Sequence, residues 1–118
     1  MPHFAQTLEL VDDPARIAEY VAHHRAVWPE VTRGLRAIGV RAMRIYLHGN
    51  RLFMSVETVD GFDPRRDYQR YASDPRTRAW DELMRTYQRR VPAADPSDGA
   101  WWSTMKPVFD LDDFPATG

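Results

Sequence analysis

The chain has 118 residues, a formal net charge of −1 and no cysteine. This length suits one domain spanning residues 1–118, and the balanced, interspersed charge argues against strong binding to nucleic acid or to a membrane surface. Without cysteine the protein has no disulfide, thiolate metal ligand or cysteine nucleophile. No apolar run approaches the roughly 20 residues of a membrane-spanning helix, and the N-terminus lacks the layout of a signal peptide. We therefore expect a cytoplasmic protein.

The first third of the chain predicts one strand followed by two helical segments. Residues 4–11 alternate loosely between apolar and polar side chains, as a half-buried strand does. Asp13 is a suitable N-cap for a helix that has Pro14 at its first position. Pro29 interrupts this helix, because the residue before a proline is pushed out of the helical conformation. It can then begin a second segment, which Gly39 ends.

The middle of the chain predicts a β-hairpin. Strands at residues 40–47 and 51–59 would flank a turn at residues 48–50, where a histidine, a glycine and an asparagine follow one another. A short helix containing Tyr68 would follow the hairpin.

The last third predicts a clearer helix and a final strand. Asp74 and Pro75 open the helix in the same way as the Asp-Pro pair near the N-terminus. After a loop at residues 92–99, residues 101–111 predict a strand, and the proline within it suits an edge or a bulge. The end of the chain, residues 113–118, is expected to be a loose tail.

The order strand, helical region, strand, strand, helical region, strand predicts an α+β fold. It is the ferredoxin-like, split βαβ arrangement, in which helices cover one face of an antiparallel sheet. The uncovered face would then carry more apolar side chains than solvent favours, so we expect a homodimer that buries part of it. The apolar residues assigned to that face are Met43, Ile45, Phe53, Trp101 and Trp102.

The leading candidate for a catalytic residue is His24. Tyr20 precedes it by four positions, so the two side chains should share one face of a helix, while His23 should point away. An imidazole that titrates near neutral pH, beside an aromatic hydroxyl, suits acid/base work on a sugar. A lone histidine is nevertheless more often a structural or surface residue, and His3, His23 and His48 are interpreted in that way.

Other chemistries find little support. Adjacent His23 and His24 diverge on a helix, and no His-x-x-x-His pair is present, so no metal site is expected. The chain has no glycine-rich phosphate loop, serine nucleophile elbow or dinucleotide fingerprint. The tryptophans can serve the core, a dimer interface or a sugar platform, and the sequence leaves these roles open. They are Trp28, Trp80, Trp101 and Trp102.

Several segments together resemble the L-rhamnose mutarotase family. The most specific is the His-Arg-Xaa-Xaa-Trp-Pro-Glu stretch, and the resemblance spans nearly the whole chain in the right order. It rests on residues 19–31, 43–47, 49–54, 80–84 and 105–111. The resemblance implies a dimeric α+β barrel, no cofactor, and interconversion of the α and β anomers of a 6-deoxy sugar.

Carried over residue by residue, the family's acid/base histidine falls on His24 and its substrate-contacting tyrosine on Tyr20. The rhamnose enzymes have a second tyrosine where this chain has Met43, and a Trp-Trp pair where it has Ala79 and Trp80. This pattern looks more like the branch described as L-fucose mutarotases. The expected substrate is therefore a 6-deoxy-L-hexose, with L-fucose favoured over L-rhamnose.

The resemblance also suggests how the pocket is built. Trp80 would pack against the sugar, Met43 and Met54 would form softer apolar walls, and Trp28 would shape the pocket floor. Two more distant alternatives remain open: a cofactor-free oxygenase of the dimeric barrel type, and a non-catalytic sugar-binding module.

Overall fold

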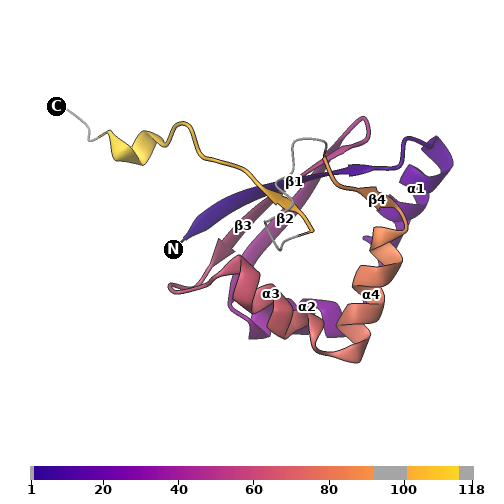
Figure 1. The fold of residues 1–118 in the computed structure, drawn as a ribbon, viewed down its shortest axis with the longest axis horizontal. Helices are drawn as coiled ribbons and strands as arrows, with labels where there is room; N and C mark the ends of the chain where they lie inside the picture. Colours follow the sequence, from indigo (N-terminus) through magenta and orange to yellow (C-terminus); the bar gives the residue numbers. More distant parts are fainter. Residues whose placement is uncertain (1, 92–100, 115–118) are drawn as a thin grey trace.

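The computed structural model describes residues 2–91 and 101–114 and shows one antiparallel sheet with helices on one face (Figure 1). Its strands follow the order β2-β3-β1-β4, and the short β5 pairs with β1 beside β4. The strands are β1 (His3–Leu10), β2 (Val40–His48), β3 (Arg51–Thr58), β4 (Gln88–Arg89) and β5 (Ser103–Thr104). The helices are α1 (Pro14–His23), α2 (Pro29–Ala37), α3 (Pro64–Ala72), α4 (Pro75–Arg85) and the 3-10 turn η1 (Leu111–Asp113).

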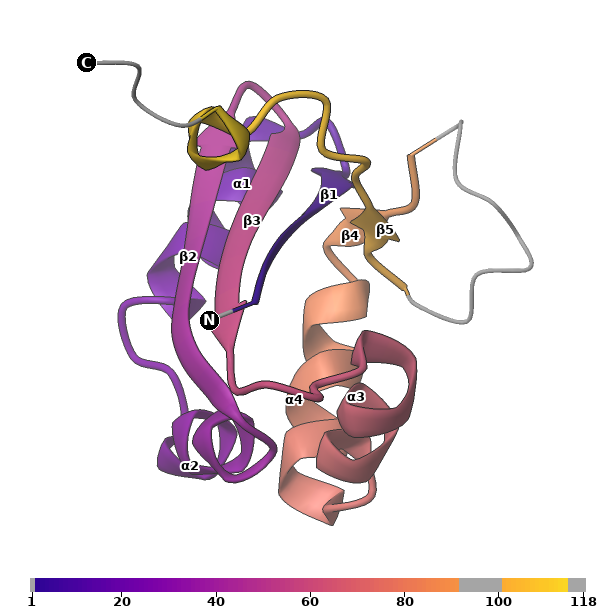
Figure 2. The same cartoon turned by 90° about the vertical axis from the view of Figure 1, so that its left-hand side faces the viewer.

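The predicted fold class is confirmed, because this strand order is that of the ferredoxin-like arrangement. Figure 2 shows β2, β3 and β1 side by side, with α2, α3 and α4 gathered at one end of the sheet. Leu8 of β1 lies directly opposite Leu52 of β3, and both side chains are fully buried on the helix-covered face. Opposite residues of an antiparallel pair share a face, so the register places every second residue in the core.

Local signals set most of the helix boundaries. The Asp13 side chain accepts a hydrogen bond from the Ala15 backbone N–H at 3.0 Å, and Pro14 opens α1 as predicted. The same Asp-Pro device starts α3 and α4. Trp28 has an extended backbone before Pro29 opens α2, as predicted, but α1 already ends at His23, earlier than the predicted interruption. Gly39, which ends α2, has a φ of +109°, and a Cβ there would lie 2.6 Å from Val59.

The predicted last strand, residues 101–111, is wrong in extent. Only Ser103 and Thr104 form β5, and the Met105 N–H adds one more bond to β1. Pro107 has no N–H to offer the sheet, and the chain then runs outward as an arm to η1 (Figure 1). We call residues 105–114 the C-terminal arm. The predicted loop at residues 92–99 lies outside the described residues, as do residues 115–118 of the predicted tail.

Two features of the sheet depart from the predictions. Strand β4 was not predicted, since its residues carry no alternating apolar pattern; pairing with Glu9 and Leu10 of β1 defines it. The assignment of Met43 and Ile45 to the uncovered face is also wrong. They lie opposite Val56 and Met54, on the face that the helices cover.

The other residues assigned to the uncovered face divide in the same way. Trp101 and Trp102 also lie on the covered side, where they line a cavity. Phe53 does lie on the open face, beside Tyr46.

Candidate functional site

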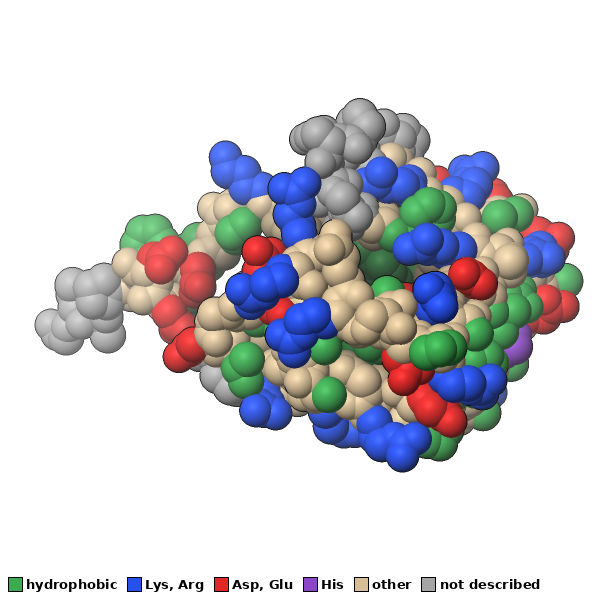
Figure 3. Space-filling view, turned by 60° about the horizontal axis from the view of Figure 1, so that its bottom comes forward, with side chains coloured by type: hydrophobic (Ala, Val, Ile, Leu, Met, Phe, Trp, Pro, Cys, Tyr) green, Lys and Arg blue, Asp and Glu red, His purple; other side chains and the backbone are tan. Residues whose placement is uncertain are grey.

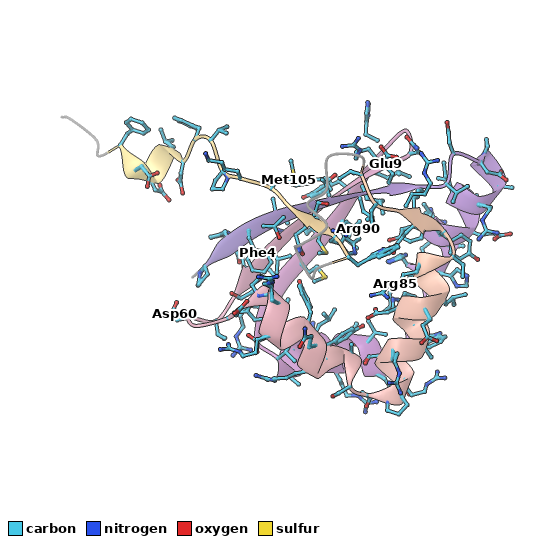
Figure 4. All side chains as sticks on the ribbon, in the orientation of Figure 1. Phe4, Glu9, Asp60, Arg85, Arg90 and Met105 are labelled. Atoms are coloured by element: carbon cyan, nitrogen blue, oxygen red, sulfur yellow. The ribbon has the colours of Figure 1, made fainter. Side chains whose placement is uncertain are left out.

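A cavity of about 670 Å³ lies between the covered face of the sheet and the helices. This size falls within the roughly 300–1,000 Å³ typical of small-molecule sites. Figure 3 shows a hollow on this side of the molecule, with hydrophobic side chains inside it and Lys or Arg side chains around it. Arg36, Arg41 and Arg85 are among the lining residues. Figure 4 shows Arg85 projecting from α4 toward the space between the helices and the sheet.

Tyr20 and His24 meet at the end of α1 and both line the cavity. His24 is the first residue after the helix, and its backbone N–H still bonds to the last turn. The centroids of the two rings are 4.4 Å apart. The predicted pairing of these side chains is therefore present in the structure. His23 points elsewhere, as expected, and its Nε2 lies 3.2 Å from the Tyr87 hydroxyl.

The position of the proton on His24 follows from its backbone contact. Nδ1 lies 2.9 Å from the carbonyl oxygen of Tyr20. A carbonyl only accepts hydrogen bonds, so Nδ1 carries the proton in the neutral ring and Nε2 keeps its lone pair. Burial lowers the pKa of His24, partly opposed by the bond to the carbonyl, and His23 lowers it further. The ring is therefore neutral at pH 7, with Nε2 available as a base.

A short hydrogen-bonded chain fixes the Tyr20 hydroxyl. Trp101 Nε1 donates to Gln88 Oε1 at 2.9 Å, and Gln88 Nε2 donates to the Tyr20 oxygen at 3.1 Å. Burial raises the pKa of Tyr20 to about 12. The hydroxyl therefore stays protonated at neutral pH and has its own hydrogen to donate to a ligand. We call Tyr20, His24, Gln88 and Trp101 the α1 wall of the cavity.

The other predicted site residues divide into lining and supporting positions. Trp80 is 5% exposed and lines the cavity, with its ring edge-on to His24 at 5.5 Å between centroids. Met43 and Met54 line the cavity from neighbouring strands. Trp28 is not among the lining residues. It packs edge-on against Trp80 at 5.2 Å and supports that ring from behind, so its place is behind the pocket and not at its floor.

A second polar group lies on α3 and α4, which sequence reasoning did not identify. Tyr68, Tyr71 and the carboxylate of Asp81 lie close enough together to interact electrostatically. All three line the cavity. Burial raises the pKa of Asp81 to about 6, and the nearby Arg85 and Tyr71 side chains oppose this rise. We call Tyr68, Tyr71 and Asp81 the α3–α4 wall.

Two buried polar atoms, on residues that line this cavity, have no hydrogen-bond partner within the described part of the chain. They are the Tyr68 hydroxyl and Oε1 of Gln6, and both are buried. Buried polar atoms in folded proteins are nearly always paired, so unpaired ones in a cavity indicate contacts that a bound molecule completes. Gln6 lies in a strand that was predicted, but its polar side chain at a core position was not recognised as a signal.

Metal and membrane features are absent from the part of the chain that the structure describes. Within residues 2–91 and 101–114, no group of three or more His, Asp or Glu side chains is arranged to hold a metal ion. Over the same residues, no helix has the length and apolar character needed to cross a bilayer.

Comparison with known proteins gives a consistent result. A family model described as L-rhamnose mutarotase matches residues 3–111. A UPF0734 protein of Dictyostelium discoideum is 42% identical over 113 residues, covering 94% of this chain and 90% of the relative. The L-fucose mutarotase of Xanthomonas campestris pv. campestris is 36% identical over 113 residues, covering 94% and 89%.

Two solved structures share the fold at low identity. The crystal structure of an L-rhamnose mutarotase from Formosa agariphila aligns with a TM-score of 0.66 and 18% identity, covering 93% of this chain and 98% of that one. The tetracenomycin F2 cyclase of Streptomyces glaucescens, a type II polyketide cyclase, aligns with a TM-score of 0.58 and 18% identity, covering 93% and 96%. At such identity these structures support the architecture alone, whereas the family model and the relatives identify the chain. It belongs to the L-rhamnose mutarotase family, whose members are isomerases that act on sugar anomers.

Proposed function

We propose that this protein interconverts the α and β anomers of a 6-deoxy-L-hexose, with L-fucose as the preferred substrate and L-rhamnose as the alternative. The observation that carries the proposal is the pairing of His24 and Tyr20 inside a cavity of suitable size in a chain of this family. The choice of L-fucose is supported by the 36% identity to an L-fucose mutarotase. It is also supported by Met43 in place of a tyrosine, and by Ala79 and Trp80 in place of the Trp-Trp pair of the rhamnose enzymes.

His24 is proposed as the residue that transfers the proton. Opening the ring requires a proton on the ring oxygen and the loss of one from the anomeric hydroxyl, and closing reverses both transfers. Both oxygens are bonded to C1, so they lie close together and one nitrogen can serve both. Because the neutral ring carries its proton on Nδ1, Nε2 first takes the proton of the anomeric hydroxyl while the bond between C1 and the ring oxygen breaks.

The same proton then moves to the ring oxygen and gives the open aldehyde. After rotation about the C1–C2 bond, His24 retrieves that proton, the ring oxygen attacks the other face of C1, and the new anomeric oxygen is protonated. Tyr20 donates a hydrogen bond to the oxygen that carries negative charge, since its raised pKa keeps the hydroxyl protonated. Trp80 and the two methionines pack against the apolar parts of the sugar.

The test is anomer exchange followed by saturation-difference NMR, with L-fucose and L-rhamnose side by side. We expect enzyme-dependent exchange that is faster on L-fucose and is lost in His24→Ala, while His48→Ala, an exposed histidine in the hairpin, keeps full activity. Preference for L-rhamnose would overturn the choice of sugar. Sugar binding without any exchange would indicate the non-catalytic module instead.

The protein is further proposed to act as a homodimer. Tyr46 and Phe53 are 54% and 38% exposed on the open face of the sheet, and the C-terminal arm carries apolar side chains that contact little of their own chain. The most exposed of these are Val108, Phe109, Leu111 and Phe114. Apolar surface of this kind is typical of an interface with a second copy. Light scattering should give a dimeric mass that falls to the monomer in a Tyr46→Asp, Phe53→Asp variant. The cytoplasmic location stays a prediction from the sequence.

A further inference from the structure

The polar residues of the α3–α4 wall have no role in the proposed proton transfer. Asp81 is the only acidic residue among the described residues that line the cavity. Tyr71 lies close to its carboxylate from α3, and Arg85 lies one turn further along α4 and attracts it. A carboxylate in a partly buried, largely apolar site loses hydration, and a structural role would be met more simply by an apolar side chain.

The Tyr68 hydroxyl gives a second and independent observation. The oxygen is buried, its side chain lines the same cavity, and it has no hydrogen-bond partner within the described residues. An unpaired buried hydroxyl costs free energy in the empty protein, and a ligand group that pairs with it recovers that loss. Asp81 and Tyr68 therefore both offer hydrogen-bonding capacity to whatever occupies the cavity.

We propose that Asp81 and Tyr68 bind the ring hydroxyls of the sugar that lie away from the anomeric carbon, and that they set which 6-deoxy-L-hexose is accepted. This inference rests on the proposed mutarotase function and deepens it. His24 and Tyr20 occupy the α1 wall and are used at C1 and the ring oxygen. The groups left for the α3–α4 wall are then the remaining hydroxyls, for which a carboxylate acceptor beside a phenolic hydroxyl is well suited.

The proposal explains how two similar sugars would be distinguished. L-fucose and L-rhamnose share their C6 methyl group and differ in the orientation of the hydroxyls at C2 and C4. A site built to hydrogen-bond one hydroxyl rejects an analogue that misplaces it, because its own buried polar atoms are then left unpaired. Asp81 and Tyr68 thus become specificity-determining residues, separate from the residue that moves the proton.

The test combines variants with deoxy sugars. Binding of L-fucose, 2-deoxy-L-fucose and 4-deoxy-L-fucose is measured by titration calorimetry, and anomer exchange by NMR, for the wild type, Asp81→Asn and Tyr68→Phe. The control is Glu82→Gln, which removes a carboxylate from the next, exposed position of α4. We expect Asp81→Asn to weaken L-fucose binding by about 10- to 100-fold and Tyr68→Phe by about 3- to 10-fold, with smaller changes in kcat.

The deoxy sugars show which hydroxyl each residue contacts. One of them should bind the wild type more weakly than L-fucose does, and that penalty should disappear in Asp81→Asn. Tyr68→Phe retains the ring and loses only an unpaired hydroxyl, so it should fold normally and keeps the test valid if Asp81→Asn does not fold.

The two proposals fail in different ways. Unchanged affinity and sugar preference in both variants, as in Glu82→Gln, would overturn the role of the α3–α4 wall while leaving the mutarotase activity intact. Weakened binding in the variants, with no anomer exchange by the wild type, would refute the proposed function and retain the binding role. If the wild type bound neither L-fucose nor L-rhamnose, both proposals would be wrong.

Discussion

The two polar walls of the cavity differ in how far their hydrogen bonds are complete. On the α1 wall the Trp101 indole, the Gln88 amide and the Tyr20 oxygen form a continuous chain, and His24 Nδ1 is held by a carbonyl. On the α3–α4 wall the Tyr68 hydroxyl has no hydrogen-bond partner within the described residues, and the Asp81 carboxylate is partly desolvated by burial.

This difference matches the two proposed roles, proton transfer at the α1 wall and sugar recognition at the α3–α4 wall. Groups that transfer a proton work best when they are already oriented, because no reorganisation is then needed as charge develops. Groups that select a ligand discriminate best when their hydrogen bonds are completed only by the correct ligand. The comparison predicts that disrupting the α1 wall lowers both stability and rate, whereas disrupting the α3–α4 wall lowers affinity and can raise stability.

The largest effect is expected from His24→Ala. Removing a positioned acid/base group lowers kcat by about 10²- to 10⁴-fold. The remaining rate should lose the part of its pH dependence that comes from the imidazole. Anomer exchange measured by NMR over a range of pH tests this, with circular dichroism to verify the fold. A loss of less than about fivefold would mean that the α1 wall is not where the proton moves.

A smaller effect is expected from Gln88→Leu, which breaks the hydrogen-bonded chain without touching the imidazole. The Tyr20 oxygen and Trp101 Nε1 then lose their shared partner, and unfolding measurements should show a loss of about 1–3 kcal/mol. We also expect kcat to fall by roughly tenfold, since Tyr20 is no longer held in place. In a cycle with Tyr20→Phe the two losses should not add, because both changes act on one bond.

Asp81→Asn should stabilise the protein, in contrast to Gln88→Leu. The pKa of Asp81 is raised from 3.8 to about 6 in the folded state, so ionising it opposes folding. That penalty is absent below pH 3.8 and grows as the pH rises to about 6. Asparagine avoids it, so the variant should be more stable than wild type at pH 7 by on the order of 1–2 kcal/mol, and no more stable near pH 4. Denaturant unfolding at the two values measures this, and an equal or lower stability at pH 7 would contradict the contrast between the walls.

The smallest effect concerns the pH below which kcat declines, which we expect to be lower than for an ordinary histidine. Burial lowers the pKa of His24, so the neutral imidazole persists below pH 6.5. We therefore expect kcat to stay level from pH 8 to pH 6.5 and to decline only below that value. Measuring the profile in the Asp81→Asn background removes the other group that titrates in the cavity. A midpoint above 6.5 would show that His24 gains a proton more readily than its buried position implies.

Much of this molecule was predictable from local sequence. The Asp-Pro starts of α1 and α4, the extended backbone at Trp28 and the tight turn at Gly49 each depend on residues adjacent in the chain. The same holds for Tyr20 and His24, because four positions on one helix fix their neighbourhood. Periodicity and connection order then gave the ferredoxin-like fold, and the resemblance of scattered segments gave the family.

The tertiary structure alone decided the rest. Strand β4 exists only because residues 88–89 pair with β1, and the bond from Gln88 to Tyr20 joins residues 68 positions apart. No local pattern marks a side chain whose partner lies so far along the chain.

The same reason explains the other misses. Whether Met43 faces the helices or the open side depends on which strand face the helices cover, and the length of the last strand depends on which of its residues pair with β1. In the sequence, Asp81 is one of two neighbouring carboxylates on α4, and only the packing of the folded chain distinguishes it from Glu82. Its burial, its raised pKa and its unpaired neighbour Tyr68 arise from packing between distant segments, which local sequence does not encode.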